Sequence, residues 1–429
     1  MISLIDKKNN FNFDNIFKWL IISIPISIII GNFVLNINVL LINILFIYLF
    51  LKKKINFHKP IIYIFFFIFI SIVMNNLITT DHFLSGKASL GIMRFLILFV
   101  ALIFFFETYE NKKFFFNIIF FLIIFVLIDV LIQYVFGRDI FGNEFATSHG
   151  KRLSGPFGDE LVVGAYLSKL FFLGLFYLFY KTNNKYLYVS YLLLAIIVIF
   201  LTQERSAFFV SLLAFTFFIF FFQIKIKYKI VLFGFLLIIL SLFIKYDETT
   251  SKKYFHQTFL QLGLSDEIHK RGGQEHTIDT FWDSRYGAHF LTALQIFNDN
   301  KILGSGIKTF RKNCGLKKYE NINSKYYSRR CNTHPHNIYL EILSEGGLIL
   351  FIPFCTLIFF LLIKNISNLI NNENYNNSLV NLCLLIILFF PIQTTGSFFS
   401  TFNGVFYWFC LSLIIHNMKL QFFRSPFQK

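Results

Sequence analysis

Long apolar runs recur along the whole chain and are separated by short polar connections. A helix needs roughly 17–25 apolar residues to cross a bilayer, and these runs approach that length. The pattern therefore predicts an all-α membrane protein of about twelve helices. The predicted spans are 16–32, 35–51, 60–75, 90–106, 114–136, 161–180, 186–202, 206–224, 229–245, 338–363, 378–397 and 400–417.

One long polar segment divides the predicted spans into two groups. Nine spans fall within residues 1–245, and three fall within residues 338–429, which also hold a polar tail. Residues 246–337 between them are mixed in charge and rich in Tyr, Asn and Gly. Stretches such as FWDSRYGAHFLTALQIF are amphipathic, so we expect short helices there that pack at the membrane surface.

The positive residues of the connections predict the orientation. Lys and Arg are concentrated in the loops on one side of the predicted spans, for example Lys52, Lys112 and Lys227, and the short loops opposite hold few. Positively charged loops stay in the cytoplasm. We expect both termini in the cytoplasm of a bacterium, a multi-pass inner-membrane protein, and residues 246–337 in the periplasm. The N-terminal residues show no A-x-A-like cleavage site and are expected to be retained.

The composition excludes a soluble domain. Of 429 residues, 56% are hydrophobic and 15% are charged, whereas soluble domains carry about 25% charged residues. The formal net charge of +17 could suggest a nucleic-acid partner. The cations lie mostly in short loops between spans, however, and no nucleic-acid-binding motif is present, so we expect no such partner. The 63 Phe fit nucleotide bias and lipid-facing positions.

The entry to the tenth span, CNTHPHNIYLEILSEGG, carries the most informative polar residues. Asn337, Glu341 and Glu345 recur every four residues and therefore share one helix face. His334 and His336 stand at the start of the helix, where free N–H groups and the helix dipole favour an anion. The alternative is an ordinary helix cap followed by a polar stripe packed against its neighbours.

Four arginines lie on the same predicted side of the membrane as His336. They are Arg152, Arg205, Arg285 and Arg311. The planar guanidinium group forms two parallel charge-assisted hydrogen bonds to a phosphate. The set therefore predicts a substrate that carries phosphate.

Two other motifs are weaker. GSGIKT at 304–309 has some likeness to a phosphate-binding loop, but its spacing differs from the full pattern and it lies on the side away from cytoplasmic ATP. Cys331, His334 and His336 could be metal ligands, yet their spacing matches no standard zinc site. We expect neither a metal nor a cofactor.

HPHNIYLEILSEGG before a late span, QERSAF at the start of an earlier span and the large outer loop resemble the O-antigen ligase and O-antigen polymerase superfamily. The resemblance implies a twelve-helix architecture of the GT-C type. It also implies metal-independent transfer of a glycan from undecaprenyl pyrophosphate, on the periplasmic face of the membrane.

The resemblance also implies roles for individual residues. His336 corresponds to the histidine that activates the acceptor hydroxyl, and Arg205 and Arg285 correspond to arginines that bind the donor pyrophosphate. We group Arg152, a weaker match, and Arg311 with them. The expected supporting residues are His334, Asn337 and Glu341. Direct displacement by the hydroxyl would invert the anomeric centre.

The acceptor stays open at this level. Lipid A–core is our first expectation (a ligase), and a growing glycan (a polymerase) or a protein are alternatives, because Phe209 and Leu350 depart from the ligase pattern. The rival from another class is a transporter or flippase of the lipid-linked glycan. Such a protein would place charge near the middle of the bilayer, where Asp129 is the clearest case.

Two of the five cysteines lie in the predicted outer segment. Cys314 and Cys331 flank a polar stretch, GLKKYENINSKYYSRR, and the oxidising periplasm makes them candidates for a disulfide. The bond would tether the entry to the tenth span and hold His336 near the arginines. Two free thiols are the alternative. Cys355, Cys383 and Cys410 fall in apolar spans and are expected to be buried.

The predicted orientation can be tested with reporter fusions. A fusion after Lys227 should report a cytoplasmic location, because the loop there is strongly positive, and a fusion near Asn298 should report a periplasmic location. A cytoplasmic signal from the second fusion would contradict both the orientation and the expected donor.

Overall fold

The computed structural model describes residues 13–52, 59–79, 81–108, 112–145, 152–262, 269–271, 274–276 and 280–418. The N-terminal residues and the polar tail after the last span, on which we based expectations about retention and the cytoplasmic side, lie outside the described residues.

The first half of the described chain is a series of apolar helices. They are α1 (Phe13–Ile22), α2 (Ile24–Ile30), α3 (Asn32–Lys52), α4 (Lys59–Ile78), α5 (His82–Thr108), α6 (Lys112–Phe136), η1 (Gly155–Phe157), α7 (Val163–Leu170), η2 (Phe171–Leu173), α8 (Gly174–Lys181), α9 (Lys185–Leu201), α10 (Arg205–Phe221) and α11 (Ile226–Tyr246).

The second half begins with short elements and ends with three long helices. The elements are α12 (Glu248–Ser251), η3 (Lys252–His256), α13 (Gln257–Gln261), β1 (His269–Arg271), β2 (Gln274–His276), η4 (Phe281–Asp283), α14 (Arg285–Asp299), α15 (Phe310–Asn313), η5 (Lys317–Tyr319), η6 (Tyr327–Arg329), α16 (Ile338–Ile370), α17 (Tyr375–Phe389) and α18 (Thr401–Asn417). The strands β1 and β2 form one antiparallel hairpin.

Every predicted span contains a helix or a helix pair. By length and composition, six described helical stretches could cross a membrane, and a seventh is possible if α1 and α2, which are bent by 53°, form one broken span. Helices α9, α10 and α17 are apolar but shorter. The all-helical membrane character is therefore confirmed, and the count of twelve spans stays a prediction.

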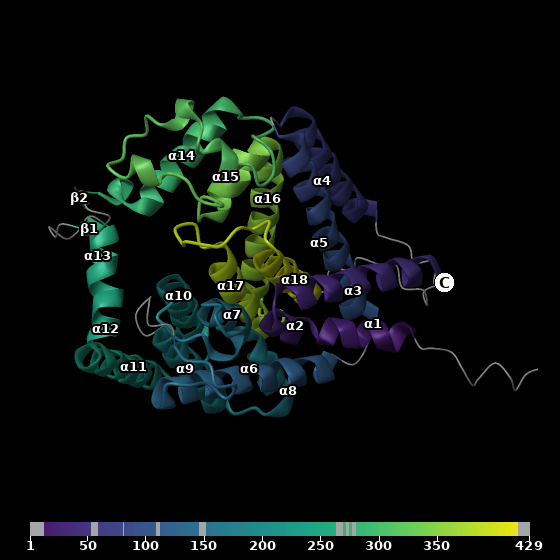
Figure 1. Cartoon of the computed structure of the whole chain (residues 1–429). Coiled ribbons are helices and arrows are strands. Elements are labelled where there is room, and N and C mark those ends of the chain that lie inside the picture. The colour runs from purple at the N-terminus through teal and green to yellow at the C-terminus, as the bar shows by residue number, and fades with distance from the viewer. Residues whose placement is uncertain are drawn as a thin grey trace, which may run out of the picture.

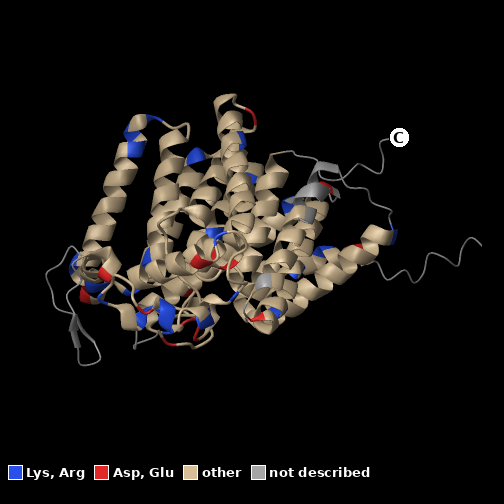
Figure 2. Ribbon diagram, turned by 90° about the horizontal axis from the view of Figure 1, so that it is seen from above, with Lys and Arg blue, Asp and Glu red and all other residues tan. Residues whose placement is uncertain are grey.

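The helices pack around a continuous apolar core. Phe95 of α5, Phe115 of α6 and Phe215 of α10 are completely buried in it. Other apolar side chains face outward along α3 and α11, as a lipid-facing surface requires. Phe therefore fills the core as well as lipid-facing positions. Charged side chains are concentrated near helix ends and in the segment between α11 and α16, and long stretches of helix carry none (Figure 2).

Helix α16 is broken at Gly347, six residues before Pro353. Gly347 has φ 65° and ψ −172°, a conformation that glycine adopts without steric cost. The N–H groups that follow donate to a neighbouring loop instead of the helix: Leu348 N to Lys301 O (2.9 Å) and Ile349 N to Ile302 O (3.0 Å). The break therefore joins the loop after α14 to α16.

The GSG motif at residues 304–306 packs directly against this break. A Cβ atom on Gly304 would lie 2.3 Å from the carbonyl oxygen of Glu345, and one on Gly347 would lie 2.4 Å from Gly304 N. Backbone contacts this close leave no room for side chains. The glycines of the motif therefore serve close packing on α16.

Helix α17 ends at Phe389, so the predicted span 378–397 is too long. Residues 390–400 form an irregular segment that lies near the centre of the view in Figure 1, between α17 and α18. Pro391 has no N–H group to continue the helix. The polar groups of this segment instead bond to the start of α16, where Asn337 Nδ2 donates to Pro391 O (2.8 Å).

Candidate functional site

The candidate site forms where the beginnings of α10 and α16 meet the irregular segment 390–400. Ser206 Oγ of α10 donates to Thr394 O (2.8 Å), and Thr395 N donates to the carbonyl oxygen of His336 (2.8 Å). Helix α14 packs against α16 from the segment that follows α11 (Figure 1). Residues that are far apart in the sequence are thereby brought to one end of the helical bundle.

His336 is held in an unusual backbone conformation. Its φ of 61° lies in the left-handed region, which costs a non-glycine residue on the order of 1–3 kcal/mol and persists only where the surroundings enforce it. Asn337 supplies part of that enforcement, because its side chain caps α16 by accepting from Tyr339 N (3.0 Å) and Leu340 N (3.1 Å). The bond from Thr395 N holds the other side of the turn.

Three rings gather around His336, and we call His289, His334 and His336 the histidine cluster. The ring centroids of His334 and His336 are 4.2 Å apart. His289 stacks on His336 at 5.3 Å with an interplanar angle of 26°, and Tyr286 meets His336 edge-on at 5.5 Å. Tyr286 and His289 are three residues apart on α14 and therefore lie on one face of that helix.

The histidine cluster is neutral at physiological pH. Burial, followed by His334, His289 and Arg285 nearby, lowers the pKa of His336 to about 3. Burial and Arg285 lower the pKa of His289 to about 4, and burial also lowers the pKa of His334. His289 is completely buried, and within the described residues its ring nitrogens form no hydrogen bond of ordinary geometry, although the Arg329 backbone acts on the ring.

Asn332 determines which nitrogen of His336 is available as a base. Its amide oxygen accepts from Thr333 N (2.7 Å), so its NH₂ group faces His336 and lies 2.8 Å from Nε2. Nε2 therefore presents its lone pair toward Asn332. If the hydroxyl group of a substrate took the position of the Asn332 NH₂ group, it could donate its proton to Nε2 of His336.

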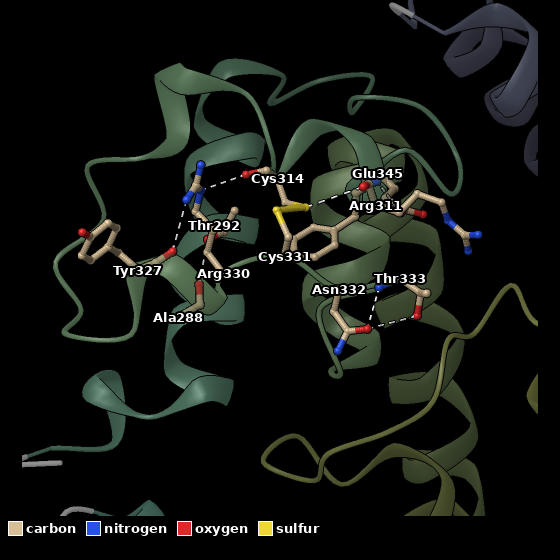
Figure 3. Close-up of a disulfide and its surroundings, with 11 residues drawn as sticks. Ala288, Thr292, Arg311, Cys314, Tyr327, Arg330, Cys331, Asn332, Thr333 and Glu345 are labelled. Carbon is tan, nitrogen blue, oxygen red and sulfur yellow. Dashed lines mark hydrogen bonds between the residues drawn. A yellow bond between two sulfur atoms is a disulfide. The ribbon is translucent and has the colours of Figure 1, made fainter. Parts of the chain in front are cut away.

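The residue before Asn332 is Cys331, which forms a disulfide with Cys314. The two Cα atoms are 5.2 Å apart. The neighbouring Arg330 strengthens the link, because its Nε donates to Cys314 O (2.9 Å), as Figure 3 shows. The bond therefore ties the entry of α16 to α15, as expected from the spacing of the two cysteines around the polar stretch.

Two of the predicted arginines lie beside the start of α10, with Lys253. We call Arg152, Arg205 and Lys253 the first cationic cluster. Burial, followed by the charges of Arg152 and Arg205, lowers the pKa of Lys253 to about 8. Arg152 lies 4.0 Å from the Glu204 carboxylate, which accepts from Gly164 N (2.7 Å).

Arg205 is oriented by neutral groups of α13. Its Nη1 donates to Thr258 Oγ1 and its Nη2 to Gln261 Oε1, both at 3.0 Å. A guanidinium group has five N–H donors, so three remain for a ligand. Tyr286 lies within electrostatic range of Arg205 and links it to the histidine cluster.

The other two predicted arginines are exposed. Arg285 opens α14 and acts on both His289 and His336 through its charge. Arg311 of α15 acts in the same way on His334. Neither guanidinium group forms a hydrogen bond or an ion pair within the described part of the chain. The structure therefore places Arg285 and Arg311 within electrostatic range of the histidine cluster and Arg205 within range of Tyr286 beside it. Arg152 lies with Glu204 and Lys253 instead.

Glu341 and Glu345 serve the scaffold of the site. Glu341 is buried and accepts from Ser397 Oγ and from Phe398 N (2.7 Å). Glu345 is buried and accepts from Lys308 N (2.7 Å) and Phe310 N (3.0 Å). The polar stripe of α16 thus fixes the loops on both sides of the histidines, and the supporting role of Glu341 in the reaction stays a prediction.

Sequence reasoning missed four residues that surround the site: Tyr286, His289, Lys253 and Asn332. The spacing of Arg285, Tyr286 and His289 on an amphipathic helix was the available signal for the first two. Lys253 and Asn332 are single polar residues in polar stretches. Among the described residues, no group of three or more His, Cys, Asp or Glu side chains is placed to hold a metal ion, and metal-free chemistry stays an expectation.

Residues 190–355 match the O-antigen ligase family model. This part of the chain is similar to the O-antigen ligase family. The match runs from α9 into α16 and includes Arg205, Arg285 and His336, whereas Arg152 lies outside it. The resemblance drawn from the motifs is thereby confirmed, and the family supports a role in glycan transfer in O-antigen or polysaccharide processing. No curated protein matches the chain.

The disulfide gives a direct prediction for the site. Replacing Cys314 and Cys331 together by Ser should lower the thermal unfolding midpoint, because a bridge over a loop of this length stabilises by about 3 kcal/mol in the chain-entropy model. Transfer activity should also fall, because Asn332 and His336 lose their tether. Cys355→Ser, on α16, is the matched control.

Alkylation of the denatured protein tests the bridge itself. Cys314 and Cys331 should react only after reduction, and Cys355, Cys383 and Cys410 should react without it. Equal labelling of all five cysteines without reductant would show that the bridge is absent.

Proposed function

We propose that the protein transfers a glycan from undecaprenyl pyrophosphate to a hydroxyl group of an acceptor on the periplasmic face of the inner membrane. The observation that carries the proposal is a neutral, left-handed His336 within electrostatic range of Arg285, in a histidine cluster that Arg311 also reaches. Lipid A–core is the acceptor that we favour. A growing glycan or a protein hydroxyl are the alternatives within the same chemistry.

The proposed reaction needs one base. Nε2 of His336 accepts the proton of the acceptor hydroxyl at the position now taken by the Asn332 amide. The oxygen then forms a bond to the anomeric carbon as the bond from that carbon to the pyrophosphate oxygen breaks. The electron pair of the broken bond stays on the pyrophosphate, and the displacement inverts the anomeric centre.

The proposed leaving group is stabilised by cations. The growing negative charge on the pyrophosphate would be met by Arg205 and Arg285, with Arg152 and Lys253 beside them. Fixed donors in a partly buried site are effective at this task because they need no reorganisation during the reaction. We propose that these side chains make a metal ion unnecessary.

Donor binding should also raise the basicity of His336. A pKa of about 3 makes histidine a weak base at neutral pH. That low value reflects burial and neighbouring positive charge without an anion. A bound pyrophosphate supplies negative charge close to the ring, which favours the imidazolium form and raises the pKa. The donor would thus prepare the base for its own reaction.

An apolar cavity offers room for the lipid tail of the donor. It has a volume of about 530 Å³ and lies between α6, α9 and α11, with Ile197 and Leu242 in its wall and Asp247 at its end. Asp247 is close to the first cationic cluster, because its carboxylate accepts from Thr250 Oγ1, which in turn accepts from Gln203 Nε2 (3.2 Å), two residues before Arg205. A prenyl chain in this cavity would lead its pyrophosphate to Arg205.

The charge that most favoured a transporter has a structural role. Asp129 of α6 accepts from Ile140 N (2.9 Å), and Gln133, one turn later, accepts from Ser154 N and Gly155 N. Asp129 and Gln133 thus fix the backbone at Ile140, before Arg152, and at Ser154 and Gly155, after it. We therefore favour an enzyme over a transporter or flippase.

The proposal includes the topology. We propose twelve spans in a GT-C-type arrangement, with residues 1–245 holding nine and residues 338–429 holding three. Residues 246–337 would then form the periplasmic segment that carries Arg285 and Arg311, and both termini would be cytoplasmic. The gathering of α10, α16 and α14 at one end of the bundle supports this arrangement.

Substitution of the base tests the proposed function. His336→Asn should abolish transfer to lipid A–core in membranes while the protein remains inserted and folded, because Asn tolerates the left-handed backbone and lacks the imidazole. Arg205→Lys should also lose most of its activity, because an ammonium group cannot bond to Thr258, Gln261 and a phosphate with the same geometry. Transfer at the normal rate by His336→Asn would remove it as the base.

The pH profile tests the effect of the donor on His336. In the free enzyme the pKa lies far below neutrality, so kcat/KM should not fall as pH drops from 8 to about 5. In the complex the pKa is higher, and kcat should begin to fall at a higher pH than kcat/KM does. Coincident acid limbs near pH 6.5 in both profiles would contradict this account.

A further inference from the structure

Arg94 is an arginine inside a membrane-spanning helix that the reaction described above does not use. It lies on α5, and its Nη2 donates to Thr401 Oγ1 (3.0 Å), at the first residue of α18. Thr401 Oγ1 also donates to Asn36 Oδ1 (3.2 Å), one turn into α3. These contacts place the guanidinium group close to the outer end of the bundle, at the same end as the histidine cluster.

Within the described residues, no carboxylate neutralises the charge of Arg94. Thr401 is its only hydrogen-bond partner among the described residues, no carboxylate forms an ion pair with it there, and its buried Nε has no partner. A guanidinium group at the edge of a bilayer is costly unless an anion or water meets it. Its position therefore indicates an anionic ligand.

A groove on the outer surface of the bundle leads to Arg94. It is lined by Phe33, Asn36, Ile37 and Leu40 of α3, with Arg94 in its wall. Phe33 is 77% exposed and Leu40 is 56% exposed. These apolar side chains face the lipid in a membrane-spanning arrangement, so the groove suits an acyl chain whose charged headgroup reaches Arg94.

Arg94 belongs to a second group of cations. Burial, Arg311 and Arg94 lower the pKa of Lys308, and the buried carboxylates of Glu341 and Glu345 oppose this shift. Arg311 and Arg94 are thus both within electrostatic range of Lys308, and we call these three residues the second cationic cluster. Lys308 is held in a left-handed conformation (φ 60°) by the bond from its N–H to Glu345. Its ammonium group has no hydrogen-bond or ion-pair partner within the described ranges.

The two cationic clusters flank the reacting centre. The first comes from the start of α10 and from η3, whereas the second comes from α5, α15 and the loop before α15. These elements lie on either side of the segment 390–400 in Figure 1. Arg311 acts on His334 from the second side, and Arg205 interacts electrostatically with Tyr286, which lies beside the histidine cluster.

We propose that Arg94 and Lys308 bind a phosphate of lipid A–core, and that one of its acyl chains lies in the groove between α3 and α5. This rests on the proposed function and deepens it, because it makes the acceptor a lipid and gives it a site separate from that of the donor. A transferase that joins two lipid-borne substrates must hold two headgroups near one base. The two clusters on either side of His336 meet that requirement.

A binding experiment with the full chain in phosphatidylcholine nanodiscs tests the proposal. The probes are diphosphoryl lipid A and undecaprenyl pyrophosphate. Arg94→Gln should raise the dissociation constant for lipid A about tenfold or more, because a charge-assisted hydrogen bond is lost, and should leave that for undecaprenyl pyrophosphate unchanged. Lys308→Gln should act in the same direction. Lys87→Gln is the matched control, since it removes an exposed charge two turns earlier on α5.

The outcomes separate this proposal from the proposed function. Unchanged lipid A binding by Arg94→Gln and Lys308→Gln, or an equal effect of Arg94→Gln on both probes, would overturn the acceptor site. If phosphatidylglycerol competed with lipid A for the site with equal affinity, the site would bind anionic lipids in general, and this result would also overturn the proposal. Lipid A binding that depends on Arg94, in a protein that transfers no glycan to lipid A–core, would overturn the ligase function and leave the lipid site standing.

Discussion

The requirement that buried backbone polar groups find partners dominates this structure. Helix α17 ends eleven residues before α18 begins, and the polar groups released there cannot be left bare in an apolar bundle. The start of α16 satisfies them: the His336 carbonyl accepts from Thr395, Asn337 donates to Pro391, and Glu341 accepts from Phe398. The same bonds force His336 into its left-handed turn, so the shape of the site follows from this requirement.

The break within α16 is a second interruption in the helices, and it meets the same requirement for hydrogen-bond partners. At Gly347 the helix gives up its own hydrogen bonds, and Lys301 and Ile302 replace them. Because Glu345 also accepts from Lys308 and Phe310, the loop before α15 is fixed on both sides of the break. The disulfide then ties α15 to the residue before Asn332. The two interruptions, between α17 and α18 and at Gly347, thus position the polar side chains of the site at one end of an apolar bundle.

Much of the helical fold could be predicted because it depends on apolar runs that are long compared with a helical turn. The histidine entry, the four arginines and the cysteine pair were also visible, since each combines residue type with position on one side of the predicted membrane. Two local features were not predicted: the helix in the span 378–397 ends early at Phe389, and α16 is broken at Gly347. Both depend on hydrogen bonds to segments remote in the sequence.

The sequence by itself determined that the chain is a helical membrane protein and which residue types stand near the entry to α16, because hydropathy and residue identity are local properties. Only the tertiary structure decided that His289 and Tyr286 contact His336, that Asn332 occupies its Nε2, and that Arg94 and Lys308 share one cationic cluster. These pairs are separated by up to hundreds of residues. Their contacts come from the packing of whole helices, which no local pattern specifies.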